Sequence, residues 1–374
     1  MKYDHALTSK EFKNPYLINT NLDETIIIDN NKLTAEYIWS LNEKERLDLI
    51  QKIKDYFKEF PTEELDKDYI DNQYKKLVKY DQNEVIAEDG TLKNSSSLCL
   101  DILRYYNRDN FYNVSGESQM SLKKVFENNL ESVLKNRMGW YTSMEDNTER
   151  PYVFNITAKM IRQGIRSSGL GFNVSQIKPV VIKYLYSKYA KQKTLDYSAG
   201  WGARAIAACS LGLEYYGIDP LTAVDVNRII KRFNGKGVCI KSGSEVNDIY
   251  NAIPEVDCVL SCPPYFTLEI YSDDNNQSVK KYSEYEAWLE FYWKETVKNC
   301  YSKLTNDGYF ILIMIEKYKK YNIATDMCKV MEEVGLKFVE ELSYKTIRNH
   351  LSGKKKSGVI SKNSEKVYVF KKVL

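Results

Sequence analysis

Short apolar runs alternate with helical segments in the second half of the chain, and this alternation constrains the fold more than any other feature. Four of the runs are bounded by Gly, Asp or Pro: 194–198, 215–219, 237–242 and 256–261. Strands that alternate with helices form a mostly parallel sheet that is covered on both faces. The sequence therefore predicts an α/β, doubly wound sheet, which binds ligands beyond the carboxyl ends of its strands.

The remaining elements extend this pattern toward both ends. A helix is predicted at 175–190, with Pro179 tolerated in its first turn. Further helices are predicted at 203–212, 221–232, 244–252, 285–304 and 323–335, and further strands at 309–315, 337–345 and 366–372. We expect the last two strands to pair as an antiparallel edge of the sheet.

The first 150 residues have a different, mainly helical character. Segments 33–60 and 120–141 repeat apolar residues at three- and four-residue spacing, and Ser40 with Glu43 has the spacing of a capping box. The polar segment 142–151 ends in Pro and is the predicted linker. Two domains are therefore expected, a helical region over 1–150 and the sheet domain over 151–374.

Composition excludes several classes of protein. The chain has 374 residues, 43% hydrophobic and 28% charged, as in soluble globular proteins. No signal peptide and no membrane span is expected from the apolar runs, and the seven cysteines lack a disulfide pattern. Two histidines are too few for a His-rich zinc site. We expect a cytoplasmic protein with no metal, no membrane partner and a weakly basic net charge of +3.

A glycine-containing turn indicates a cofactor site. In "LDYSAGWG" (195–202), Gly200 and Gly202 follow a strand and open a helix, where glycine lets a ligand lie against the backbone. Asp219 closes the next strand, where an acid can accept hydrogen bonds from ribose hydroxyls. The pattern favours an adenosine-containing cofactor. NAD is disfavoured because the third glycine of its fingerprint is missing, and the phosphate-loop signature is absent.

A second turn indicates a site for an amine. "LSCPPYF" (260–266) places two prolines at a strand end, which fixes φ and removes two N–H donors. The carbonyl of Pro263 is then free to accept a hydrogen bond from an exocyclic amine, while Tyr265 stacks on the base. The alternative is an ordinary strand terminator followed by core aromatic residues.

Together the two motifs resemble those of the S-adenosylmethionine-dependent amino methyltransferases, which modify adenine N6 or cytosine N4 in DNA and sometimes RNA. Asp196, Gly200 and Gly202 match the family pattern D-x-F-x-G-x-G, and residues 263–265 match [D/N/S]-P-P-[Y/F/W]. Segment 171–189 is similar to the family's segment beside the methionine end of the cofactor. The similarity spans roughly residues 155–374 and is greatest to phage and large-virus members, which would place the protein in a host cell.

The resemblance implies a class I methyltransferase-like fold, S-adenosylmethionine as cofactor, and methyl transfer to adenine N6 or cytosine N4, with DNA favoured. The implied cofactor-binding residues are Asp196, Ser198, Ala199, Gly200, Gly202, Asp219, Pro220, Glu245 and Ser175, and the resemblance implies that Glu245 approaches the adenine ring. The implied catalytic residues are Cys262, Pro263, Pro264, Tyr265 and Phe266, with Tyr265 or Phe266 stacking on a flipped base.

Two positions depart from the family pattern. Ser198 stands where most members carry Phe, and Cys262 stands where Asp, Asn or Ser accepts a hydrogen bond from the target amine. A thiol is a weak donor and acceptor. The neighbouring Ser261 is expected to point elsewhere, because side chains alternate along a strand. Two other functions therefore stay open: an RNA base methyltransferase, and a non-catalytic, nucleic-acid-binding subunit.

Two regions are candidates for contacts with nucleic acid. A Gly/Ser-rich loop over 348–366 carries Arg348, Lys354, Lys355 and Lys356, which can form a phosphate clamp or a solvated loop. The region 1–150 is left for target recognition by elimination. The sequence leaves open whether the polymer is DNA or RNA, whether the base is adenine or cytosine, and the oligomeric state.

Overall fold

The computed structural model describes residues 23–93, 96–138, 140–142, 149–151, 155–272, 274–345 and 365–373. The chain forms two compact units, each built from two stretches of sequence. The first unit lies within 1–69 and 111–174, and the second within 70–110 and 175–374.

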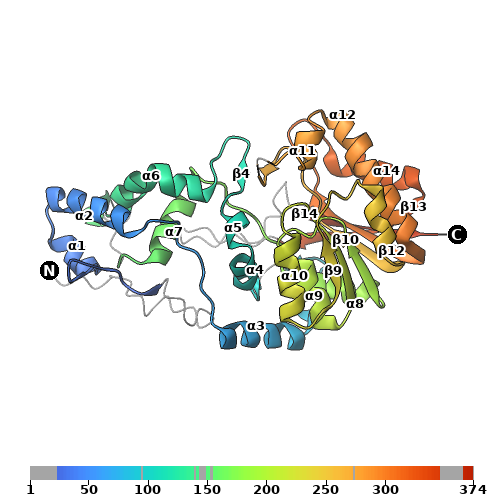
Figure 1. The fold of residues 1–374 in the computed structure, drawn as a ribbon, viewed down its shortest axis with the longest axis horizontal. Helices are drawn as coiled ribbons and strands as arrows, with labels where there is room; N and C mark the ends of the chain where they lie inside the picture. The colour runs from blue at the N-terminus through green and yellow to red at the C-terminus, as the bar shows by residue number, and fades with distance from the viewer. Residues whose placement is uncertain are drawn as a thin grey trace. The chain divides into compact units, whose positions relative to one another are not determined.

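The second unit is built on an eight-stranded sheet (Figure 1). Its order is β3-β13-β14-β12-β10-β7-β8-β9, and every pairing is parallel except those of β14 with β12 and β13. The strands are β3 (Leu92–Lys93), β7 (Lys193–Asp196), β8 (Glu214–Ile218), β9 (Lys236–Ile240), β10 (Val256–Ser261), β12 (Leu304–Ile315), β13 (Leu336–Lys345) and β14 (Glu365–Lys372). The predicted α/β, doubly wound fold is confirmed.

The antiparallel pair at the end of the sheet is also confirmed, with one difference in position. The reversed strand is β14, which lies between β12 and β13 rather than outermost. The two-residue strand β3 then pairs with β13. No sequence pattern marked β3, because two residues are too few to show strand alternation.

Helices cover both faces of the sheet (Figure 1). On one face, α8 (Pro179–Tyr189), α9 (Ala203–Leu211) and α10 (Ala223–Arg232) pack side by side. The other face carries η3 (Asn247–Ala252), α12 (Tyr285–Ala287), η4 (Trp288–Lys294), α13 (Glu295–Lys303) and α14 (Ile323–Val334). The helix predicted at 285–304 is thus continuous in sequence but contains a π-helical turn, η4. Trp288 and Trp293 of that turn are fully buried.

Residues 70–110 belong to the sheet unit, which corrects the predicted boundary at 150/151. This stretch contains most of α3 (Lys67–Lys79), then η2 (Gln82–Val85), β3 and α4 (Leu100–Tyr106). The Tyr74 ring stacks on Phe233 of the segment after α10, with ring centroids 4.1 Å apart, and Asp71 pairs with Arg232. These contacts join residues far apart in sequence, so composition along the chain did not reveal them.

Lys183 anchors the end of α3 to α8. Its Nζ donates to the carbonyl oxygens of Leu77, Val78 and Tyr80 at 2.9, 2.8 and 3.0 Å. The last carbonyl groups of a helix have no partner within the helix, so a cation beside them satisfies several at once.

We expect Lys183→Met to lower the free energy of unfolding by about 2–4 kcal/mol, because it leaves three carbonyl groups without their charged donor. Urea unfolding of both proteins measures this change. Lys188→Met is the matched control, because Lys188 lies on the same helix and forms a more exposed ion pair with Glu340 that contributes about 0–1 kcal/mol. Equal effects of the two substitutions would contradict the role given to Lys183.

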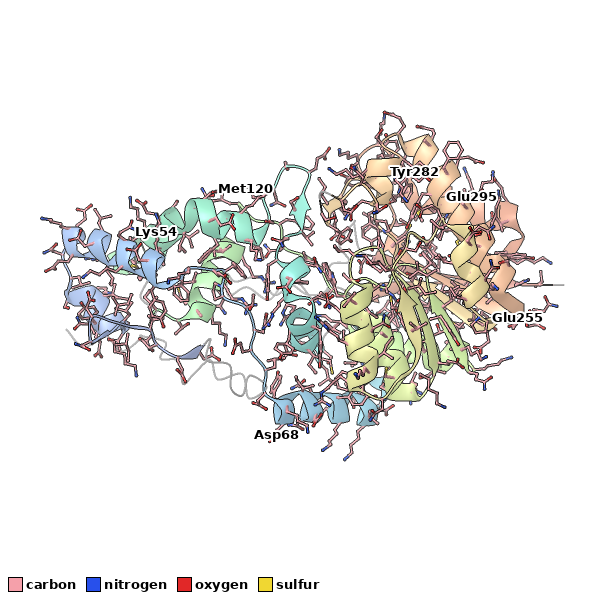
Figure 2. The ribbon with its side chains drawn as sticks, viewed as in Figure 1. Lys54, Asp68, Met120, Glu255, Tyr282 and Glu295 are labelled. Carbon is pink, nitrogen blue, oxygen red and sulfur yellow. The ribbon has the colours of Figure 1, made fainter. Side chains whose placement is uncertain are left out.

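The first unit is mainly helical. Its elements are β1 (Ile27–Ile28), β2 (Asn31–Lys32), α1 (Ala35–Ser40), α2 (Glu43–Tyr56), β4 (Ser115–Gly116), α6 (Leu122–Arg137), β5 (Trp140–Thr142), β6 (Glu149–Pro151) and α7 (Ala158–Ser167). Lys54 on α2 and Met120 before α6 are labelled in Figure 2. A buried ion pair between Glu63 and Arg162 is completed by the Tyr112 hydroxyl, which donates to Glu63 at 2.5 Å.

Two predictions for this region need correction. The segment 33–60 forms two helices, because Asn42 rather than Ser40 is the N-cap, and the capping box pairs Asn42 with Glu45. The predicted linker at 142–151 is not a unit boundary, because the chain passes between the units at 69/70, 110/111 and 174/175. At its ends β5 pairs with β6 in antiparallel register, and residues 143–148 lie outside the described residues.

Candidate active site

A buried carboxylate organises the carboxyl end of β7. Asp196 is 0% exposed and accepts hydrogen bonds from Arg204 Nε at 2.7 Å, Tyr215 Oη at 2.6 Å and Ser261 Oγ at 2.7 Å. Arg204 also donates to the Ser198 carbonyl oxygen. Asp196 therefore fixes the turn through its neighbours, and its oxygens are already engaged within the protein.

The glycine turn between β7 and α9 requires its glycines for two different reasons. Gly200 and Gly202 have φ values of +51° and +84°, in the left-handed region that other residues rarely adopt. A Cβ on Gly202 would also lie 2.7 Å from Ile229 Cδ1. Between β7 and Gly200, the buried Ala199 donates its N–H to the Ile218 carbonyl oxygen at 2.9 Å, which ties the turn to β8.

Asp219 joins this turn to the start of α10. Its carboxylate accepts backbone N–H groups from Gly200 at 2.9 Å, Leu221 at 2.9 Å and Thr222 at 2.8 Å. Burial raises the pKa of Asp219, and these hydrogen bonds oppose that rise. Pro220 is half-buried between Asp219 and α10. A carboxylate has about four lone-pair positions, so beside the three backbone donors the remaining position can accept from the Thr222 hydroxyl or from the hydroxyl of a ligand.

The segment after α4 reaches the same turn. Asn107 is fully buried, and its Nδ2 donates to the carbonyl oxygens of Trp201 at 3.1 Å and Leu103 at 2.8 Å. One helical turn earlier, Arg104 Nη1 donates to Gln176 Oε1 at 3.2 Å. The Gln176 Nε2 donor is buried and has no hydrogen-bond partner among the described residues. No sequence pattern pointed to Arg104 or Asn107, because only the fold brings them to the turn.

Ser175, predicted to bind the cofactor, is exposed. It directly precedes Gln176, and α8 begins three residues further on at Pro179, the first-turn position predicted for that proline. In this segment the buried polar atom is therefore Gln176 Nε2, whereas Ser175 is exposed.

The Pro-Pro turn lies beside the glycine turn because β10 pairs with β7. Ser198 N–H donates to Ser261 Oγ at 3.1 Å, and Ser261 in turn donates to Asp196. Ser261 is thus engaged with Ser198 and Asp196 of the glycine turn. Pro263 is buried and Pro264 is half-buried.

Cys262, Tyr265 and Glu365 form a chain of contacts at this turn. The Cys262 Sγ lies 3.0 Å from the Tyr265 hydroxyl, and that hydroxyl donates to Glu365 Oε1 at 2.8 Å. Glu365 is the first residue of β14. Burial raises the pKa of the Cys262 thiol to about 12, so the thiol is neutral near pH 7.

The aromatic rings of this turn are more buried than predicted. Phe266 is 5% exposed, has φ +52°, and packs between Tyr285, Trp288 and Tyr321. The prediction that Phe266 can stack on a base is therefore wrong, because core rings cover it. Tyr265 is 6% exposed, with its hydroxyl turned to Glu365.

A second acid and two rings lie near the Pro-Pro turn. Burial raises the pKa of Glu269 to about 7. The hydrogen bond donated by Tyr271 lowers this pKa, and the charge of Glu365 raises it further. The Tyr271 ring centroid lies 6.1 Å from that of Trp201 in the glycine turn. Glu269 belongs to the short strand β11 (Glu269–Ile270).

The loop after β9 carries Glu245, predicted to approach the adenine ring. Its carboxylate pairs with Lys281 Nζ at 2.7 Å, and Lys281 ends α11 (Ser278–Lys281). Burial raises the pKa of the Tyr292 hydroxyl, while hydrogen bonds with Ser198 and Ser244 lower it. Tyr292 comes from the π-helical turn η4 and connects this loop with the glycine turn. The sequence did not single out Lys281 or Tyr292.

Three further features concern binding to nucleic acid, a membrane or a metal ion. The basic residues Arg348, Lys354, Lys355 and Lys356 lie outside the described residues. Within the described ranges, no helix is long and apolar enough to cross a membrane, and no three His, Cys, Asp or Glu side chains are placed to hold a metal ion.

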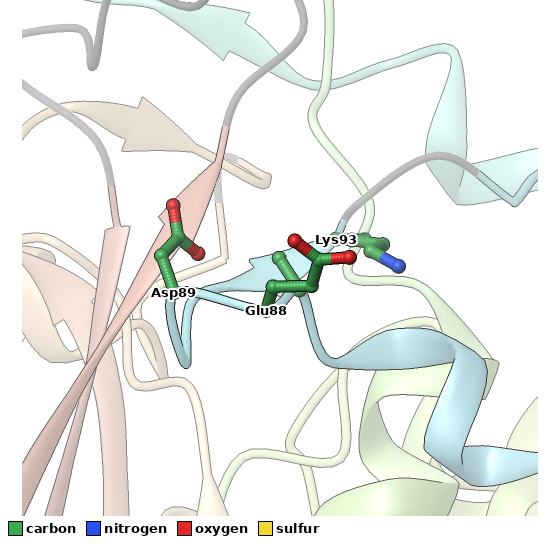
Figure 3. Close-up of a pocket in the computed structure, with 4 residues that line it drawn as sticks. Glu88, Asp89 and Lys93 are labelled. Atoms are coloured by element: carbon green, nitrogen blue, oxygen red, sulfur yellow. The ribbon is translucent and has the colours of Figure 1, made fainter.

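A pocket is lined by Ala87, Glu88, Asp89 and Lys93, around the turn before β3 (Figure 3). Asp89 accepts hydrogen bonds from the N–H and the hydroxyl of Thr91, at 3.1 and 2.6 Å. The Asp89 carboxylate therefore stabilises the turn. None of the predicted site residues lines this pocket, so the pocket is separate from the candidate site.

Several solved structures are similar to the chain at low identity. A TehB-like SAM-dependent methyltransferase from Corynebacterium glutamicum is 16% identical over 53% of this chain and 89% of that chain, with a TM-score of 0.34. TrmN from Thermus thermophilus is 11% identical over 59% and 69%, with a TM-score of 0.36. Magnesium protoporphyrin IX methyltransferase from Synechocystis, solved with bound SAM, is 11% identical over 51% and 76%, with a TM-score of 0.33. Similarities this distant assign no activity to the chain. No protein-family model and no curated protein matches it.

Proposed function

We propose that the second unit binds S-adenosylmethionine and transfers its methyl group to an exocyclic amine of a nucleic-acid base, adenine N6 or cytosine N4, with DNA favoured by the motif resemblance. One observation carries the proposal: the glycine turn and the Pro-Pro turn end neighbouring strands and are joined through Ser198, Ser261 and Asp196. A cofactor at the first turn and an amine at the second would lie at the same edge of the sheet, where doubly wound sheets bind ligands.

The residues at the glycine turn fit an adenosine cofactor with an amino-acid tail. The left-handed turn at Gly200 and Gly202 leads into α9, where a ligand can lie against the backbone, and Asp219 can accept from a hydroxyl donor such as a ribose hydroxyl. The buried Gln176 Nε2 donor and the Arg104 guanidinium beside it suit a carboxylate, which accepts charge-assisted hydrogen bonds. Glu245 suits a polar edge of adenine, as the motif resemblance implies.

Bound S-adenosylmethionine supplies an electrophilic methyl group on a sulfonium sulfur. The residues of this chain contribute mainly alignment, which accounts for a large share of the rate of such transfers. The Pro263 carbonyl, in a turn whose prolines offer no N–H, accepts a hydrogen bond from the amine. Tyr265 borders the same position, and its hydroxyl donates to Glu365 Oε1 at 2.8 Å. The helical first unit contributes target recognition.

The proposal predicts labelled base in a direct assay. Purified protein is incubated with methyl-labelled S-adenosylmethionine and with duplex DNA, single-stranded DNA or structured RNA, and the digested nucleosides are resolved by mass spectrometry. We expect label on N6-methyladenine or N4-methylcytosine in DNA. Label in RNA alone would correct the polymer, and no label on any polymer, with cofactor bound in a calorimetric titration, would favour a non-catalytic nucleic-acid-binding subunit.

A matched pair of variants connects the label to the Pro-Pro turn. Tyr265→Ala should abolish labelling, since it removes the ring beside the amine site. Phe370→Ala is the control, because Phe370 is a fully buried ring of the same core on β14 that leaves a similar cavity away from the turn. Equal loss in both variants would attribute the effect to general destabilisation.

A further inference from the structure

We propose that Cys262, Tyr265 and Glu365 form a path that removes the proton from the amine during methylation, with Glu365 as the final acceptor. This inference rests on the proposed transfer of a methyl group to an amine. It gives Cys262 a role that the family pattern leaves unexplained, since a thiol replaces the usual Asp, Asn or Ser.

The direction of the hydrogen bonds follows from counting protons. The Tyr265 hydroxyl has one hydrogen, which it donates to Glu365 Oε1 at 2.8 Å. An ionised carboxylate can only accept. The 3.0 Å contact between Tyr265 Oη and Cys262 Sγ must therefore use the thiol hydrogen, donated to the tyrosine oxygen. This arrangement leaves the sulfur lone pairs available to accept a hydrogen from the amine.

The proton balance is closed within the chain. As the amine nitrogen becomes cationic, its N–H proton passes to Cys262 Sγ, the thiol proton to Tyr265 Oη, and the hydroxyl proton to Glu365. The N–H, S–H and O–H bonds break as new S–H and O–H bonds form. Cys262 and Tyr265 end in their starting protonation states, and Glu365 changes from carboxylate to carboxylic acid. A weak base such as a thiol suffices because a cationic methylated amine is a strong acid.

The charges around Glu365 suit a group that can both take up and release a proton. Burial raises the pKa of Glu365, while the Tyr265 hydrogen bond and the charge of Arg204 lower it. Glu269, held by Tyr271, also interacts with Glu365. The neighbouring Lys366 is engaged with Glu316 at 2.8 Å and Glu341 at 2.6 Å. Glu365 thus titrates above an ordinary glutamate, which brings it closer to working pH.

The first test is the pH dependence of methylation by Glu365→Gln. In the wild-type protein, kcat should fall as the pH drops through the pKa of Glu365, because the protonated acid cannot take up a proton. Glutamine still accepts a hydrogen bond from Tyr265 but cannot take up a proton, so we expect kcat to be about tenfold to hundredfold lower. The fall of kcat at low pH, the acid limb of the pH profile, should be lost, and the affinity for the cofactor should be unchanged. Glu341→Gln is the control, because it removes a carboxylate from the neighbouring strand without touching the path.

The second test needs no methylation. Alkylation of Cys262 by iodoacetamide at alkaline pH, followed by peptide mass spectrometry, reports the thiolate fraction, and fragment ions separate Cys262 from Cys258. The charge of Glu365 raises the pKa of Cys262, and once the thiol is ionised, a hydrogen bond that the Tyr265 hydroxyl turns to donate to the thiolate lowers it. Glu365→Gln should therefore speed alkylation about threefold or more, and Tyr265→Phe should slow it. Effects of opposite sign are not expected from simple loosening of the site.

The two tests separate this inference from the proposed function. Opposite alkylation effects together with the lost acid limb support the path. A wild-type acid limb retained in Glu365→Gln, or alkylation unchanged by both substitutions, overturns the path while leaving methyl transfer intact. A wild-type protein that methylates no polymer overturns the proposed function and with it the path as a catalytic device, even where alkylation shows the three residues coupled.

Discussion

Replacing Asp196 with alanine should lower the free energy of unfolding by about 3–5 kcal/mol, the cost typical of removing one partner from a buried ion pair. Arg204 would remain charged although the residue is only 4% exposed. Tyr215 and Ser261 would also lose their acceptor. Urea unfolding followed by circular dichroism measures the change.

The control for this prediction removes both charges. In Asp196→Ala with Arg204→Met, no buried guanidinium is left unpaired, and the double variant should regain part of the stability lost by the single one. A single variant within about 0.5 kcal/mol of wild type, the range of a neutral surface substitution, would contradict the structural role of Asp196.

Asp219→Ala should weaken binding of S-adenosylmethionine about tenfold to hundredfold, the loss expected for one or two hydrogen bonds to a charged acceptor. Two effects combine in this variant. The carboxylate is the expected acceptor for the ribose, and it also holds the Gly200 N–H, so the glycine turn loses a support. A calorimetric titration measures the affinity.

Asp257 provides a matched control for Asp219. Its carboxylate likewise accepts three backbone N–H groups, from Lys191, Gln192 and Lys193 at 2.6, 2.9 and 2.8 Å, but at the opposite end of β7. Asp257→Ala should therefore destabilise the unit to a similar extent and leave cofactor affinity within about twofold of wild type, less than the loss of one hydrogen bond. An equal loss of affinity in both variants would mean that Asp219 acts only through stability.

The sheet was predictable because its signals are local. Each strand of the parallel core is a short apolar run ended by Gly, Asp or Pro, and burial on both faces makes such runs continuous. The glycine turn was predictable for the same reason, since the left-handed φ values of Gly200 and Gly202 are a property of the residue type. The place of Pro179 in the first turn of α8 followed from the fixed φ of proline, although the helix begins at Pro179 and not at residue 175 as predicted.

The unit boundary and the roles of several side chains depended on contacts between distant segments. Residues 70–110 have the helical character of the first unit but pack on the sheet through Tyr74, Asp71 and Lys183. The aromatic Phe266 is equally compatible with a base-stacking surface and with a core, and only its three ring neighbours decided for the core. Glu365 entered the site because β14 runs antiparallel beside β12, which places its first residue at the carboxyl end of the parallel strands.

The sequence alone therefore determined the α/β, doubly wound sheet and the two turns at which its chemistry is expected, since backbone conformation and strand burial are encoded by neighbouring residues. Only the tertiary structure decided which side chains meet at those turns. Hydrogen bonds such as Asn107 to Trp201 and Tyr265 to Glu365 join residues about a hundred positions apart. Such partners are selected by the packing of the whole sheet, and no local pattern of residue types records them.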